Sequence, residues 1–101
     1  MLAGLPKFSK NEHFKILFRS KNLKIERIVS YGQKTPPGKW LKQGKAEWVA
    51  VLKGRAKVLF KGVRKPVSLK TGDTLFIPAK TLHRVEWTRP RKPTVWLAVH
   101  F

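Results

Sequence analysis

Apolar and polar residues alternate along much of this chain, and a two-residue period predicts β-strands. The clearest case is residues 55–61, where Ala56, Val58 and Phe60 fall on one side and basic residues fall mostly on the other. Such alternation is typical of a strand with one buried face and one solvated face. The pattern therefore favours a fold built from half-buried strands.

Seven further segments with strand character are separated by turn residues, and they complete the predicted set of strands. They span residues 13–20, 23–30, 46–53, 67–69, 74–77, 83–87 and 94–101. The segment 13–20 also fits one turn of helix, and we favour a strand. Eight short strands at intervals of about ten residues, with no convincing helix, predict an all-β sandwich or barrel.

The intervening segments carry the residues that end strands. Residues 1–12 are predicted to be an irregular lead-in, and the proline-rich stretch 31–39 is predicted to be a loop. Gly54 is predicted to form a hairpin turn between its neighbouring strands, because glycine accepts a positive φ. Gly72 with Asp73 predicts a second tight turn.

Length and composition exclude several classes of protein. A chain of 101 residues has room for one core and therefore for a single domain, and 42% apolar residues favour a folded chain over a disordered one. The absence of cysteine excludes disulfides, thiolate metal sites and cysteine nucleophiles. No segment approaches the roughly 18 apolar residues of a membrane span, and the N-terminus lacks a signal-peptide pattern. We therefore expect a soluble cytoplasmic protein.

The charge is strongly asymmetric, with 23 Lys and Arg against 5 Asp and Glu, a net charge of +18. The basic residues are scattered through solvent-type positions of many strands and turns. This scatter suggests positive supercharging of a neutral or acidic parent by engineering, and the alternative is a natural basic protein. Either surface would bind nucleic acid or other polyanions by counterion release, without reading bases, or would assemble with anionic partners. The candidate residues are Lys53, Arg55, Lys57, Lys61, Arg64, Lys65 and Lys70.

Two ordered motifs resemble those of a known family. Glu47 and Gly54 form the pattern E-x6-G, and Gly72 to His83 read G-D-x4-P-x4-H. These spacings are similar to the two signature motifs of the cupins, and segments such as EWVAVLKGRA and WLAVHF are similar to small single-domain bacterial cupins. The resemblance covers roughly residues 23 to 101. It implies a jelly-roll β-barrel, spanning about residues 14–101 here, with a metal site in its lumen.

The resemblance also implies which residues would form the lumenal site. Glu47 matches the family's glutamate and His83 matches the last of its three histidines. The H-x-H pair is missing, because its places fall on Leu41 and Gln43, or on Trp40 and Lys42, depending on the gap. A depleted set of Gln43, Glu47 and His83 would hold a divalent ion weakly, and the alternative is a pocket for a small molecule.

Three further residues are candidate ligand-binding groups in the lumen, namely Trp40, Trp87 and His100. For the tryptophans the alternative is core filling. In the strand 94–101 the two-residue period places Trp96, Ala98 and His100 on one side, and the pattern leaves open which side faces inward. No catalytic residue or reaction is assigned. The resemblance implies a homodimer, which a charge of +18 on each subunit opposes.

Overall fold

The computed structural model describes residues 4–101, and it confirms the all-β prediction with eight strands and no helix among those residues. The strands are β1 (His13–Arg19), β2 (Lys24–Ser30), β3 (Glu47–Lys53), β4 (Arg55–Phe60), β5 (Val67–Lys70), β6 (Thr74–Ile77), β7 (His83–Thr88) and β8 (Thr94–His100). Each predicted strand is present, with ends that move by one residue at most. Residues 4–101 accordingly contain no helix that could span a membrane.

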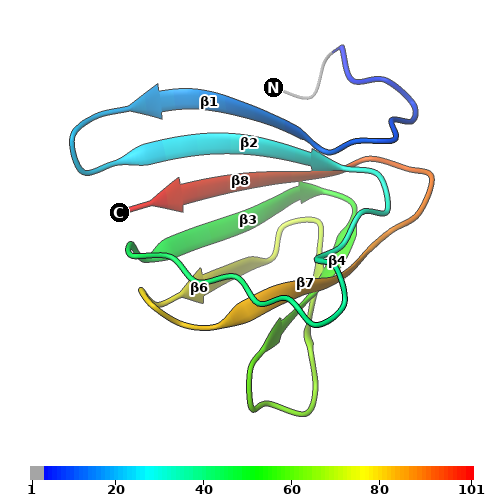
Figure 1. Ribbon diagram of the computed structural model, residues 1–101. Helices are drawn as coiled ribbons and strands as arrows, with labels where there is room; N and C mark the ends of the chain where they lie inside the picture. The colour runs from blue at the N-terminus through cyan, green and yellow to red at the C-terminus, as the bar shows by residue number, and fades with distance from the viewer. Residues whose placement is uncertain (1–3) are drawn as a thin grey trace.

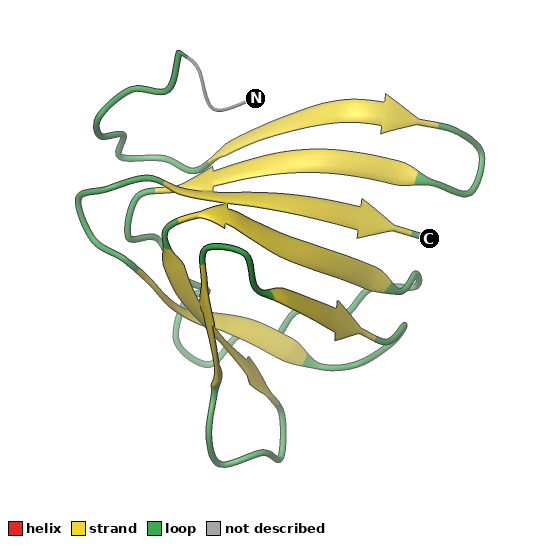
Figure 2. Cartoon of the chain, turned by 180° about the vertical axis from the view of Figure 1, so that it is seen from behind, coloured by secondary structure: helices red, strands yellow, loops and turns green. Residues whose placement is uncertain are grey.

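The strands form two antiparallel sheets that pack face to face. The larger sheet has the order β1-β2-β8-β3-β6, and the smaller has the order β5-β4-β7. Figure 1 shows β1, β2, β8 and β3 side by side across the top of the molecule, with β4 and β7 below them. The view from behind, in Figure 2, shows the same two layers meeting at an angle.

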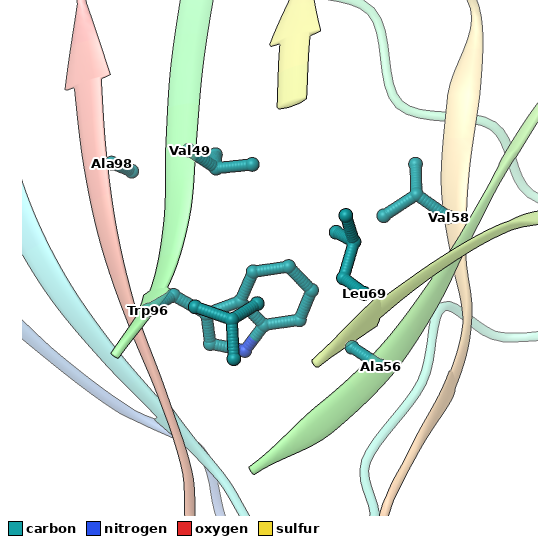
Figure 3. Close-up of a cluster of buried hydrophobic side chains, with 7 residues drawn as sticks. Val49, Ala56, Val58, Leu69, Trp96 and Ala98 are labelled. Carbon is teal, nitrogen blue, oxygen red and sulfur yellow. The ribbon is translucent and has the colours of Figure 1, made fainter. Parts of the chain in front are cut away.

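The core joins the two sheets around one tryptophan. Trp96 of β8 is 5% exposed and clusters with Val49 of β3, Leu69 of β5 and Val58 of β4. Figure 3 shows its indole lying between the side chains of the larger sheet and those of the smaller. Its neighbour Ala98 continues the same face of β8. The sequence did not decide which side of β8 faces the interior. In the structure Trp96, Ala98 and His100 face inward.

A second cluster lies on the outer face of the larger sheet, where the N-terminal segment covers it. Val29 and Val95 are cross-strand partners, and both pack with Tyr31 and Leu5. The Tyr31 hydroxyl donates to the carbonyl oxygen of Pro6 at 2.9 Å. The described part of the irregular lead-in is therefore packed against the domain.

Gly54 corrects one prediction. We expected a hairpin there, but β3 pairs with β6 and β8, whereas β4 pairs with β5 and β7. The chain turns at Gly54 from one sheet into the other, with φ at +104°. A β-carbon at this position would lie 2.5 Å from the Oγ1 and 2.7 Å from the Cα of Thr94. Close approach to β8, in addition to the positive φ, therefore requires glycine.

The Gly54 corner gives a testable prediction. Gly54→Ala should lower the free energy of unfolding by about 1–2 kcal/mol for the left-handed backbone and by a further ~1–3 kcal/mol for the clash with Thr94. Gly62→Ala is the matched control, since Gly62 has φ +85° but a β-carbon added there would meet no atom within 4 Å. Urea unfolding of both variants checks this, and equal losses would show that the approach to Thr94 does not matter.

Candidate functional site

A cavity of about 370 Å³ lies between the two sheets. Its apolar wall includes Val49, Val58, Ile77, Val85 and Trp96, which come from both sheets. Its ionisable and amide groups are Glu12, Glu26, Lys34, Gln43, Glu47, His83 and His100. All three members of the predicted set Gln43, Glu47 and His83 therefore line one cavity, together with the predicted His100.

The imidazole of His100 lies between two carboxylates from the neighbouring strands. β8 is flanked by β2 and β3, so Glu26 and Glu47 approach His100 from opposite sides. The Nε2 atom of His100 is 3.3 Å from Oε1 of Glu26 and 3.8 Å from Oε2 of Glu47. Glu47 is 7% exposed and His100 is 8% exposed. The order of the strands therefore assembles an acid–imidazole–acid group that no linear motif contains.

The loop before β3 closes over this group. The Gln43 amide Nε2 donates to Oε1 of Glu47 at 2.7 Å. The backbone of this loop is held by two contacts, in which Leu41 forms an antiparallel bridge with His83 and the Lys80 N–H donates to the Gln43 carbonyl at 2.7 Å. The amide of Gln43 is thus fixed as a donor to the glutamate.

His83 is held in one orientation at the start of β7. Its Nδ1 lies 2.8 Å from the carbonyl oxygen of Thr81, which can only accept, so Nδ1 is the protonated nitrogen. The residue is 3% exposed, and its ring lies beside Phe60, with ring centroids 6.4 Å apart. In the neutral imidazole, Nε2 is therefore the acceptor.

A third carboxylate reaches the cavity from the N-terminal segment. The Trp96 indole N–H donates to the Ser30 hydroxyl oxygen at 3.2 Å. The Ser30 hydroxyl in turn donates to Oε2 of Glu12. The Trp96 indole N–H and the Ser30 hydroxyl therefore both have hydrogen-bond acceptors, and neither is left as an unpaired buried donor. The core tryptophan is thus connected to the Glu12 carboxylate through one serine.

Three of the five acidic residues of the protein line this cavity, namely Glu12, Glu26 and Glu47. The other two are on the surface: Asp73 accepts the backbone N–H of Lys70 at 2.9 Å, and Glu86 pairs with Arg84 at 3.0 Å. Sequence reasoning missed Glu12 and Glu26 as site residues. The available signal was their presence in a chain with only five acidic residues.

The residues present do not fit the metal centre that the resemblance implies. Within residues 4–101, no group of three or more His, Cys, Asp or Glu side chains is placed to hold a metal ion. Of the two possible places for the family's H-x-H pair, Leu41 and Gln43 line the cavity whereas Trp40 and Lys42 do not, and the Gln43 amide N–H is directed at the Glu47 carboxylate. In this structure Gln43 is hydrogen-bonded to Glu47, and the imidazole of His83 is held separately by the Thr81 carbonyl.

The two predicted tryptophans do not line the cavity. Trp40 lies between Lys61 and Arg84, whose charged groups are 5.9 Å and 5.7 Å from its ring centroid. Trp87 should share a face with His83 by strict alternation, but the pairing of β4 with β7 shifts register after Lys57. This bulge turns Trp87 to the outer face, where it pairs with Lys57.

The predicted polyanion-binding residues are all exposed. Arg55, Lys57 and Lys70 project from the outer face of the smaller sheet. Lys53 ends β3, and the remaining three lie in the β4–β5 loop: Lys61, Arg64 and Lys65. These seven basic residues thus lie on the outside of the molecule, whereas three of the five carboxylates line its cavity.

This arrangement favours ligands that donate hydrogen bonds. Ionised carboxylates only accept, and His83 in its neutral form offers an accepting Nε2, since its Nδ1 faces the Thr81 carbonyl. An imidazole beside carboxylates is also the usual means of moving a proton to or from a bound molecule. The cavity can therefore bind hydroxyl or amine groups and has the side chains for acid–base chemistry.

Comparison with solved structures gives the same fold. A putative mannose-6-phosphate isomerase from Ralstonia eutropha JMP134 has 45% identity and a TM-score of 0.95, covering 98% of this chain and 92% of that one. A cupin superfamily protein from Desulfitobacterium hafniense DCB-2 has 15% identity and a TM-score of 0.78, covering 96% and 83%. An RmlC-like cupin from Shewanella frigidimarina NCIMB 400 has 18% identity and a TM-score of 0.72, covering 88% and 74%.

No match to the chain is found among curated proteins. The family described as "Cupin domain" matches residues 28–100, which is most of the chain and includes both motifs. The matched residues form the jelly-roll sheets and carry Glu47, His83 and His100. The chain therefore belongs to the cupin family.

Proposed function

We propose that the cavity binds a small polyhydroxylated molecule of the sugar or sugar-phosphate class. The observation that carries this proposal is the gathering of Glu12, Glu26 and Glu47 on one cavity in a chain with five acids. Carboxylates accept hydrogen bonds from several hydroxyl groups at once, and apolar walls suit the C–H faces of a sugar ring. A volume of about 370 Å³ is in the range of small-molecule sites.

The charge distribution supports a neutral or anionic ligand over a cationic one. A net charge of +18 repels cations from the molecule as a whole, although the lumen itself is rich in acceptors. Lys34 is exposed and belongs to the cavity lining, so an ammonium group is available at its rim. A sugar phosphate with its hydroxyls at the glutamates and its phosphate at Lys34 would use both the carboxylate acceptors of the lumen and the ammonium group at its rim.

The similar structure from Ralstonia eutropha supports the same ligand class, since its name is that of a putative mannose-6-phosphate isomerase. Aldose–ketose isomerisation moves one proton from the carbon beside the carbonyl to the former carbonyl carbon, and a second proton from the hydroxyl of that neighbouring carbon to the former carbonyl oxygen. In this proposal the carboxylate–imidazole group of Glu47 and His100 moves both protons, and no atom is gained or lost overall. Proton NMR of mannose 6-phosphate in deuterated water tests this reaction directly.

Binding through the lumenal glutamates gives the first prediction. Glu47→Gln should weaken binding of mannose 6-phosphate by about 10-fold or more, because a hydrogen bond to a charged group is worth roughly 1.5–3 kcal/mol. Glu86→Gln, which removes the same charge on the outside, should leave the affinity within about two-fold. Isothermal titration calorimetry measures both, and equal effects would place the ligand outside the lumen.

The role of Lys34 gives a second prediction. Lys34→Gln should weaken binding of mannose 6-phosphate by about 5-fold but leave binding of unphosphorylated mannose unchanged, because only the phosphate uses the ammonium group. Lys39→Gln is the matched control, since Lys39 is an exposed lysine of the same loop that does not line the cavity. The same titrations with both sugars check the result. An equal loss for both sugars would contradict a phosphate subsite at Lys34.

We also propose that a second copy of the chain covers β1, as a homodimer. All seven residues of β1 are exposed, and Phe14, Ile16 and Phe18 are 60%, 45% and 52% exposed. β1 is an edge strand of the larger sheet, and exposed apolar edges are sites of strand pairing. The register shift between Ile16 and Phe18 places Phe18 on the face of β1 opposite to Phe14 and Ile16, so a second copy paired along this edge would contact apolar side chains on both faces.

The dimer would complete the cavity, because Phe14 belongs to its lining and faces the same side as Ile28 of β2. Two copies of +18 repel each other, so the proposed dimer should strengthen as salt screens the charge. Phe14→Ser with Phe18→Ser should shift sedimentation velocity to the monomer. Phe76→Ser, at the opposite edge of the sheet, should not. Dissociation by Phe76→Ser alone would move the interface to β6.

A further inference from the structure

The outer face of the smaller sheet carries a basic surface beside an aromatic ring. Across the strands, Arg55 is paired with Lys70, and Lys57 is paired with both Ser68 and Trp87. These residues line a second hollow, of about 380 Å³, on the outside of the molecule. The sheet register therefore brings three cations and one indole together around a concave surface.

The three cations lack carboxylate partners. In the described part of the chain, no ion pair joins Arg55, Lys57 or Lys70 to a carboxylate. Asp73 also lines the hollow, but its Oδ2 accepts the backbone N–H of Lys70. Like charges directly opposite on neighbouring strands repel, as Arg55 and Lys70 do here. An anion in the hollow would relieve this repulsion.

Simple counterions bind to charge and need no aromatic ring, but the indole of Trp87 also lines this hollow. The bulge in the pairing of β4 with β7 turns its indole out beside Lys57, whose Nζ lies 5.7 Å from the ring centroid. A basic groove interleaved with aromatic rings is typical of surfaces that bind single-stranded nucleic acid, where bases stack on the rings. Stacking of a base on an indole is stronger than an exposed cation–π contact. A base can therefore replace the Lys57 ammonium over the ring and release it for a phosphate.

We propose that this hollow binds single-stranded nucleic acid, with phosphates at Arg55, Lys57 and Lys70 and one base stacked on Trp87. The β4–β5 loop, which projects at the foot of Figure 1, extends the basic surface with Lys61, Arg64 and Lys65. None of these groups is arranged to read base edges, so binding is independent of sequence. The site is separate from the lumenal cavity and does not depend on the ligand proposed for it.

The test compares two triple variants that lose the same charge. One carries Arg55→Gln, Lys57→Gln and Lys70→Gln in the hollow, and the control carries Lys7→Gln, Lys21→Gln and Lys92→Gln at exposed positions outside both the hollow and β1. Fluorescence anisotropy with a labelled oligothymidylate measures both at several salt concentrations. The hollow variant should bind at least 10-fold more weakly than the control, and its log–log salt slope should be smaller by about 2, since each single-strand contact contributes about 0.7. Equal losses would overturn the site in favour of diffuse attraction to the whole +18 surface.

Substitutions of Trp87 distinguish base stacking on the indole from attraction by charge alone. Trp87→Ala should weaken binding of the oligothymidylate by about 5- to 100-fold, whereas Trp87→Phe should retain most of it because the ring remains. Both variants keep the net charge, and thermal unfolding shows whether they are folded. A duplex of equal length should bind the wild type and Trp87→Ala alike, because its bases are not free to stack. Unchanged single-strand binding by a folded Trp87→Ala would overturn the proposal.

Discussion

The burial of Trp96 between the two sheets is the contact on which the rest of the structure depends. Its indole fills the space between β3 and β8 on one side and β4 and β5 on the other, while its N–H is satisfied by Ser30. An aromatic side chain of this size contributes more buried area than any other residue of the cluster. Because β8 alternates strictly, fixing Trp96 inward also fixes Ala98 and His100 inward. The core and the acid–imidazole group are therefore set by one strand register.

The protein separates its charges between the inside and the outside of the sandwich. Most of the carboxylates line the cavity, and the basic residues cover the exterior. Inside, Glu26 and Glu47 have the imidazole of His100 between them, and Gln43 donates to Glu47. Outside, the cations are solvated, so their mutual repulsion is weakened by water and salt. A strongly basic protein can in this way keep an acceptor-rich pocket.

The departure from the family's metal ligands changes the chemistry of the lumen. Where the resemblance implies histidines, this chain has Leu41, which bridges to His83 through its backbone, and Gln43, which donates to Glu47. The loop therefore keeps its place over the cavity while its side chains differ. Binding and proton transfer in the cavity would accordingly depend on hydrogen bonds, imidazoles and carboxylates.

The sequence by itself determined the strands and the family, and its candidate lumenal residues Gln43, Glu47, His83 and His100 all line the cavity. Alternation is a local property, so each strand was predictable, and the motif spacing identified Glu47 and His83. Tertiary structure alone decided which strands became neighbours. Glu26, Glu47 and His100 meet because β2 and β3 flank β8, although they are far apart along the chain. Gly54 turns between sheets instead of forming a hairpin, and a bulge reverses the face of Trp87. Pairing partners and bulges depend on contacts between distant segments, which a local pattern does not contain.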